Sequence, residues 1–62
     1  MQYKIKELRE NASMTQEQLA EKSGITRVTI ARLESGMQSD LKVSSLKKLA
    51  EALSCKVGDL IA

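Results

Sequence analysis

Arg27, Val28 and Arg32 lie within six consecutive residues, and their side chains carry the most distinctive chemistry in the chain. A guanidinium presents a rigid fork of N–H donors that matches O6 and N7 of guanine, and an apolar side chain can contact a thymine methyl. In a helix with about 100° per residue, Val28 points roughly 160° away from the apolar Ile30. The three residues therefore predict an exposed helix face that can bind nucleic-acid base edges.

The groups needed for acid–base or nucleophilic catalysis are nearly absent. The sequence has no histidine, which excludes histidine zinc sites and Ser-His-Asp or Cys-His chemistry. Its one cysteine, Cys55, has no second cysteine or histidine to activate it, so we expect a small, half-buried packing residue. A chain of 62 residues also leaves little core for a deep pocket. We therefore expect no enzymatic activity, no cofactor, no metal and no small-molecule ligand.

The composition is that of a soluble globular domain. Hydrophobic residues make up 42% and charged residues 29%, which fits neither a disordered nor a membrane protein. No apolar run approaches the roughly 18–20 residues of a membrane span, and the N-terminus has no apolar signal segment. An unpaired cysteine fits a reducing cytoplasm. The net charge of +2 does not by itself imply a nucleic-acid partner, so the positions of the charges matter more.

Helical spacing dominates the chain, which we interpret as a single all-α domain over residues 1–62. Apolar residues recur at steps of three and four, proline is absent, and β-branched residues do not alternate with polar ones. The expected architecture is a compact five-helix bundle with short connections. The five helices are expected at about residues 2–11, 15–23, 27–35, 43–54 and 57–61.

Capping residues bound the second and third of these helices. Thr15 begins a capping box (TQEQ), in which threonine and glutamine side chains bond the backbone N–H groups of each other's residues. Thr26 is the N-cap of the third helix, and Gly24 and Gly36 end the two helices in the left-handed conformation. Two short helices joined by so tight a turn predict a helix-turn-helix at about residues 15–35, although most helix pairs of this kind bind nothing.

The other helix ends and the inward stripes are also predicted from residue types. Asn11 tolerates the left-handed conformation and is the expected end of the first helix. Asp40 and Ser44 compete as the N-cap of the fourth helix. The inward stripes are expected to contain Ile5, Leu8 and Ala12 in the first helix, and Val43, Leu46, Leu49, Ala50 and Leu53 in the fourth.

Nearly the whole chain resembles one known family. The stretch MTQEQLAEKSGIT (residues 14–26), followed by TIARLESG (29–36), is similar to the helix-turn-helix of the Cro and phage-repressor (Xre-like) family. The residues LAEAL (49–53) and VGDLI (57–61) match its last two helices. The resemblance implies a lambda-repressor-like fold and a sequence-specific transcriptional regulator, repressor-like, that reads the major groove of double-stranded DNA with its third helix.

Four residues match family positions that contact DNA bases. Thr26, Arg27 and Val28 match the positions that enter the major groove, and Arg32 matches the base-contacting position one turn further on. Val28 stands where the family often has a small polar residue. Its contact with a methyl group is therefore inferred from its chemistry and not from the family.

Four further residues match family positions with other roles. Gln16 matches a glutamine that binds a backbone phosphate and braces the recognition helix, and Ser35 matches a small polar residue that touches phosphate. Arg9 and Glu34 match a pair that forms a buried salt bridge between the first and third helices. They are 25 positions apart on two helices that must pack, which also favours a structural pair over two exposed charges.

The resemblance also implies a partner. Members of the family usually bind as symmetric pairs on half-sites about one helical turn apart. We therefore expect a homodimer on a palindromic operator, formed through the C-terminal helices, where Leu60 and Ile61 offer an exposed apolar end.

The loop after Gly36 departs from the family pattern, which commonly has a basic loop with a proline here. Residues 37–42 contain no proline and one acid, and the loop is about one residue longer than the commonest form. With the weak net charge, this favours an alternative, a helical protein-interaction module (antitoxin-like or bridging) that keeps the fold without specific DNA binding. The two arginines oppose it, and salt separates the two hypotheses, because DNA binding weakens steeply as salt rises.

Overall fold

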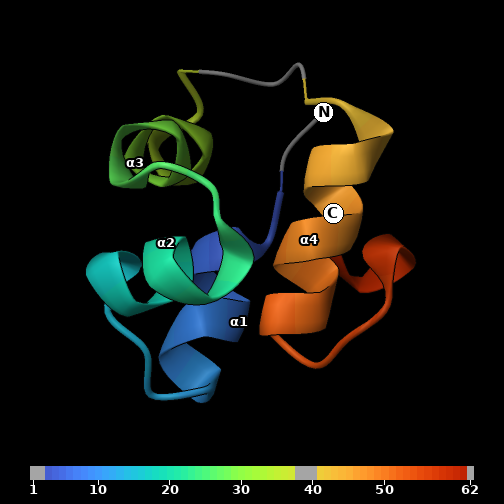
Figure 1. The fold of residues 1–62 in the computed structure, drawn as a ribbon, viewed down its shortest axis with the longest axis horizontal. Coiled ribbons are helices and arrows are strands. Elements are labelled where there is room, and N and C mark those ends of the chain that lie inside the picture. Colours follow the sequence, from blue (N-terminus) through green and yellow to red (C-terminus); the bar gives the residue numbers. More distant parts are fainter. Residues whose placement is uncertain (1–2, 38–40, 62) are drawn as a thin grey trace.

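The elements of regular structure that the molecule shows are helical. The computed structural model describes residues 3–37 and 41–61. An isolated antiparallel bridge between Tyr3 and Ile61 is the one β feature within these two ranges. The elements are, in chain order, α1 (Ile5–Asn11), α2 (Gln16–Ser23), α3 (Arg27–Ser35), α4 (Val43–Ala52) and the 3-10 helix η1 (Val57–Leu60) (Figure 1). The prediction of an all-helical fold is confirmed.

The last element is a single 3-10 turn, so the predicted count of five α-helices is not confirmed. The Asp59 carboxylate accepts a hydrogen bond from the backbone N–H of Lys56 (3.0 Å), which closes the turn. The carbonyl of Leu60 then accepts from the backbone N–H of Lys4 (2.7 Å), and Ile61 is extended. Pairing with the N-terminal segment therefore takes the chain out of the helix after one turn.

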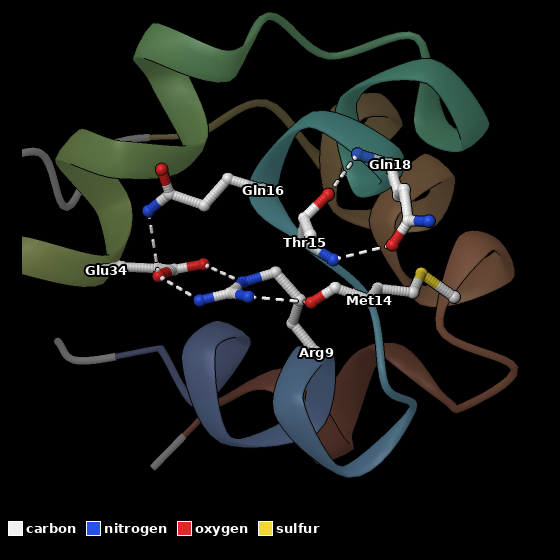
Figure 2. A network of polar contacts seen from close by, with 6 residues as sticks. All are labelled: Arg9, Met14, Thr15, Gln16, Gln18 and Glu34. Atoms are coloured by element: carbon white, nitrogen blue, oxygen red, sulfur yellow. Dashed lines mark hydrogen bonds and ion pairs between the residues drawn. The ribbon is translucent and has the colours of Figure 1, made fainter.

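Local hydrogen bonds fix both ends of α2. Thr15 Oγ1 accepts from the backbone N–H of Gln18 (3.0 Å), and Gln18 Oε1 accepts from the backbone N–H of Thr15 (2.8 Å) (Figure 2). Gly24 follows the helix in the left-handed conformation (φ 77°), and its N–H donates to the carbonyl of Ala20. The predicted capping box and glycine cap are both confirmed.

The boundaries of α3 are also those expected from its sequence. Thr26 Oγ1 accepts from the backbone N–H of Thr29 (3.3 Å), and Gly36 (φ 81°) ends the helix. The N–H of Met37 donates to the carbonyl of Arg32 (2.9 Å), as is typical after a left-handed cap. Three residues separate α2 from α3, so the turn leaves little freedom in how the two helices cross.

α1 ends at Asn11, as predicted, but the reason for this end differs from the prediction. Asn11 is still helical, and the residue in the left-handed conformation is Ser13 (φ 57°). Ala12 lies between them as the C-cap and is exposed, although the helical spacing predicts it to face the core. The inward stripe of α1 therefore ends at Leu8, which packs against the core.

The ends of α4 differ as well. Its N-cap is Lys42, which makes no side-chain cap, and Ser44 lies inside the helix; the other predicted cap, Asp40, lies outside the described residues. The helix stops two residues before Ser54, which has a left-handed φ of 56°. Val43 is 64% exposed, because it is the first residue of α4, one turn beyond the buried part of the stripe.

The core joins faces of all five elements. α2 packs against both α3 and α4, α1 packs against α3, and η1 packs against α4. Figure 1 shows α3 and α4 at opposite sides of the molecule. The buried apolar residues are Ile5, Leu19, Ile30, Leu33, Leu46, Leu49, Ala50, Ala52, Leu53 and Leu60. Because α3 contributes only Ile30 and Leu33 to this core, its opposite face is free to meet a partner.

The expectation that Leu60 is an exposed apolar end is wrong. Its side chain is fully buried, because η1 turns back onto α4 and places Leu60 in the core. Ile61 is half-buried next to Tyr3. The C-terminal residues of the described chain therefore stabilise the domain itself.

Candidate nucleic-acid interface

The outer face of α3 forms an open groove together with the start of α2. Arg27, Val28 and Arg32 are exposed on this face, and the exposed fraction of Val28 is 60%. Met37, which follows the glycine cap, is 81% exposed and lines the same groove. The lining residues are Gln16, Arg27, Val28, Ala31, Arg32, Ser35 and Met37.

The charge of this groove is positive. Two arginines line it and no acidic residue does, while apolar atoms supply most of its remaining surface. Neither Arg27 nor Arg32 forms an ion pair with the residues that the structure describes. Both guanidinium groups therefore keep their N–H donors available for an external acceptor.

The hydroxyl groups at the two ends of α3 take part in local bonds. Thr26 Oγ1 lies 2.8 Å from Thr29 Oγ1 and also caps the helix. Ser35 Oγ donates to the carbonyl of Arg32 (3.1 Å). Both residues are exposed, so their hydroxyl groups can exchange these bonds for contacts with a ligand.

A polar network lies beneath this groove, between α1, α2 and α3 (Figure 2). Arg9 donates from Nε to Glu34 Oε2 (2.7 Å) and from Nη2 to Glu34 Oε1 (3.1 Å), which makes a bidentate pair. Arg9 Nη1 also donates to the carbonyl of Met14 (2.7 Å). The exposed fractions of the two charged side chains are 12% and 5%, so the pair is almost completely shielded from water.

Gln16 connects this network to the groove. Its Nε2 donates to Glu34 Oε1 (3.1 Å), while its side chain also lines the outer groove with Arg27 and Arg32. The resemblance implies that Gln16 braces the recognition helix, and the bond to Glu34 in α3 is such a contact. The sequence does not indicate that its partner is the carboxylate paired with Arg9, because that depends on how α2 and α3 cross.

The pKa of the Glu34 carboxyl reflects two opposing effects. Burial raises the pKa, because it disfavours the charged form. The hydrogen bonds from Arg9 and Gln16, with the charges of Arg9 and Lys6, outweigh burial and hold the pKa below its ordinary value. Glu34 is therefore a carboxylate at neutral pH and accepts hydrogen bonds from both partners.

Groups suited to other chemistry are sparse in the described part of the chain. Cys55 is half-buried, and burial and the charge of Asp59 raise its pKa, which disfavours the reactive thiolate. No cluster of His, Cys, Asp or Glu side chains that could hold a metal ion occurs in residues 3–37 and 41–61. None of the helices described here is long and apolar enough to cross a membrane.

Comparison with known proteins decides the family. A family model described as helix-turn-helix matches residues 5–60, which is most of the chain. The chain belongs to this helix-turn-helix family. The resemblance to Cro and phage repressors is thereby confirmed. The matched family is a helix-turn-helix family and the similar proteins carry the names of transcriptional regulators, which agrees with the expectation that this domain is not an enzyme.

Three curated relatives share this domain. The HTH-type transcriptional repressor RghR of Bacillus subtilis is 43% identical over 49 residues, 79% of this chain. The uncharacterized HTH-type transcriptional regulator RghRB of the same organism is 38% identical over 58 residues, 94% of this chain. The chain spans only 36% and 42% of the lengths of these two relatives.

The third relative is closer in length. It is an uncharacterized HTH-type transcriptional regulator of Archaeoglobus fulgidus, 39% identical over 61 residues, which are 97% of this chain and 83% of the relative. No solved structure matches the chain significantly. Together, the family and the relatives support a DNA-binding regulator.

Proposed function

We propose that the protein is a sequence-specific transcriptional regulator that inserts α3 into the major groove of double-stranded DNA. The observation that carries this proposal is the outer face of α3, where Arg27, Val28 and Arg32 are exposed around a groove without acidic residues. A major groove about 12 Å wide admits a helix, and its base edges offer the acceptors and methyl groups that these side chains can contact.

The contacts divide into base readout and phosphate positioning. Arg27 and Arg32 bind guanine edges, and Val28 contacts a thymine methyl next to them. Thr26, the N-cap of α3, contacts a base next to Arg27 in this proposal. Gln16 and Ser35, which line the groove with the two arginines, contact phosphates.

The functional unit is a homodimer on a palindromic operator in the cytoplasm, and it acts as a repressor. The Cα extents of the domain are 24 × 22 × 19 Å, whereas half-sites one turn apart are separated by about 34–36 Å. Two domains of this width can place their α3 helices that far apart when the contact between them is made by elements other than α3. α4 and η1 lie across the molecule from α3 (Figure 1), which is consistent with a C-terminal interface without Leu60.

A selection from random-sequence duplexes, with sequencing of the bound DNA, tests the proposal. We expect a palindrome whose half-site centres are about 10 base pairs apart. The Arg27→Ala and Arg32→Ala variants should each relax the sequence at one position per half-site. Affinity for the recovered duplex should fall steeply as salt rises.

Other results would contradict the proposal in different parts. A single unrepeated motif would contradict the dimer but not the insertion of α3 into the major groove. Recovery of no motif, with weak binding that does not depend on sequence, would contradict specific recognition and favour the protein-interaction module.

A further inference from the structure

Among the residues that the structure describes, Gln16 is the one whose side chain belongs both to the outer groove and to the buried network beneath it. It is the first residue of α2, and its amide reaches across to α3. A primary amide has a carbonyl acceptor at one end and two N–H donors at the other, so its orientation decides what it can offer a ligand. Whatever fixes this orientation therefore acts on ligand binding.

The Glu34 carboxylate fixes it. Glu34 Oε1 accepts from Gln16 Nε2 (3.1 Å), and a flipped amide would bring two oxygen acceptors together at the same place. Figure 2 shows the amide nitrogen of Gln16 directed to Glu34 and its oxygen pointing away. One N–H of Gln16 is thus committed to the protein, and the second N–H remains available to an external acceptor.

Arg9 makes this arrangement compatible with a negatively charged ligand. A buried carboxylate behind a phosphate contact would repel the phosphate if it were not neutralised. Arg9 binds both oxygens of Glu34, at 2.7 Å and 3.1 Å, and its third contact, with the Met14 carbonyl, ties it to the segment that leads into α2. The carboxylate therefore keeps its hydrogen bond to Gln16 while its charge is balanced from the opposite side.

We infer that Glu34, held by Arg9, is a positioning residue for DNA binding that orients the Gln16 amide toward the DNA backbone. The inference rests on the proposed function, since it concerns the same surface. It assigns to the Arg9–Glu34 pair a role in affinity in addition to its role in holding α1 to α3.

For Glu34→Gln, the lost charge and the lost positioning of Gln16 predict opposite changes in DNA affinity. Glu34→Gln removes a negative charge, which by itself strengthens binding to polyanionic DNA. It also lets the amides at positions 16 and 34 pair in either orientation, which weakens the oriented contact. Glu17→Gln is the matched control, because Glu17 is exposed in the first turn of α2 and makes no hydrogen bond to Gln16 among the described contacts.

A double-mutant cycle on DNA affinity tests the inference. Glu34→Gln is measured in the natural sequence and in a Gln16→Met background, by fluorescence anisotropy at low salt. The probes are the selected duplex and a mixed-sequence duplex, because a backbone contact does not depend on sequence. All variants are compared at a temperature at which circular dichroism shows each of them folded.

We expect Glu34→Gln to weaken binding by about two- to tenfold in the natural sequence, the scale of one hydrogen bond. In the Gln16→Met background it should no longer weaken binding, and Glu17→Gln should leave affinity equal or higher. Glu34→Asp keeps the charge and shortens the side chain. Glu34→Asp should weaken binding about as much as Glu34→Gln. It therefore still tests the positioning of Gln16 if Glu34→Gln does not fold.

Three results would overturn the inference. Additive effects of the changes at positions 16 and 34 would assign Glu34 a purely structural role. Tighter binding by Glu34→Gln would show that charge alone governs the site. An absence of binding to either duplex would overturn the proposed function together with this inference, whereas the first two results leave the proposed function intact.

Discussion

The two sides of α3 use arginine in opposite ways. Beneath the helix, the Arg9 side chain is almost fully shielded from water and donates its hydrogen bonds to Glu34 and the Met14 carbonyl. On the outer side, Arg27 and Arg32 are exposed and pair with no acidic residue that the structure describes. An arginine with an internal acidic partner stabilises the packing of the helices. An arginine without such a partner keeps its N–H donors available for a ligand.

This difference predicts that the two sides can be damaged separately. Changes in the buried network should reduce stability most strongly, and changes on the outer face should reduce affinity while stability stays nearly constant.

Glu34→Ala should cause the largest change, because it leaves Arg9 as an unpaired, shielded charge. Removal of one partner of a buried pair costs about 3–5 kcal/mol of unfolding free energy, which is most of the stability of a small domain. Thermal unfolding followed by circular dichroism measures it. The control, Glu17→Ala, removes an exposed charge and should cost less than about 1 kcal/mol. Equal melting temperatures for the two variants would contradict a stabilising role of the pair.

Arg32→Ala should have the reverse effect. Loss of a bidentate contact with guanine weakens binding to the selected duplex by about 1–3 kcal/mol, while the unfolding free energy stays within about 0.5 kcal/mol. Lys22→Ala is the matched control, since it removes the same charge from the exposed end of α2, outside the groove. If Lys22→Ala weakens binding as much as Arg32→Ala, the outer face of α3 is not the surface that reads DNA.

Gly24→Ala tests the turn that joins α2 to α3. Gly24 has φ 77°, and a Cβ there meets no atom within 4 Å, so the expected loss of about 1 kcal/mol is purely conformational. Gly58→Ala is the matched control, because Gly58 also has open space around it but no left-handed φ. Chemical denaturation should show a loss at position 24 and little or none at position 58. A similar loss at both positions would show that the left-handed turn is not what Gly24 supplies.

The pH dependence of stability should give the smallest effect. The pKa of Glu34 is lower in the folded chain than its ordinary value of 4.5, so the unfolded chain binds the proton first as the pH falls. The contribution of Glu34 to the unfolding free energy is complete at a pH above its ordinary pKa. This contribution is lost as the pH falls through the pKa of the folded chain. Unfolding free energies at successively lower pH should therefore fall less in Glu34→Gln than in the natural sequence. An unchanged pH dependence would show that another carboxyl group is responsible.

Local sequence signals predicted the ends of α2 and α3. The capping box at Thr15, the cap at Thr26 and the glycines at 24 and 36 each depend on bonds within a few residues. Such bonds form in the same way wherever the helices later pack, so residue types are sufficient to locate them. The outward direction of Val28 follows from helical periodicity for the same reason.

The features that the sequence did not predict depend on contacts between distant segments. Leu60 was expected at the surface, but the pairing of its carbonyl with Lys4 turns η1 inward, and that partner lies at the other end of the chain. The bond between Gln16 and Glu34 likewise exists only after α2 and α3 have crossed. Ser13, and not Asn11, takes the left-handed conformation after α1, although the helix ends at Asn11 as predicted.

The face that binds DNA can be identified directly by following the backbone amides of the isotope-labelled protein by NMR during titration with the selected duplex. We expect the largest shifts along residues 26–32 and at Gln16, and smaller shifts in α4 and η1, where a second copy of the domain would touch. Shifts concentrated on α4 and η1, with residues 26–32 unchanged, would contradict the assignment of α3 as the reading helix.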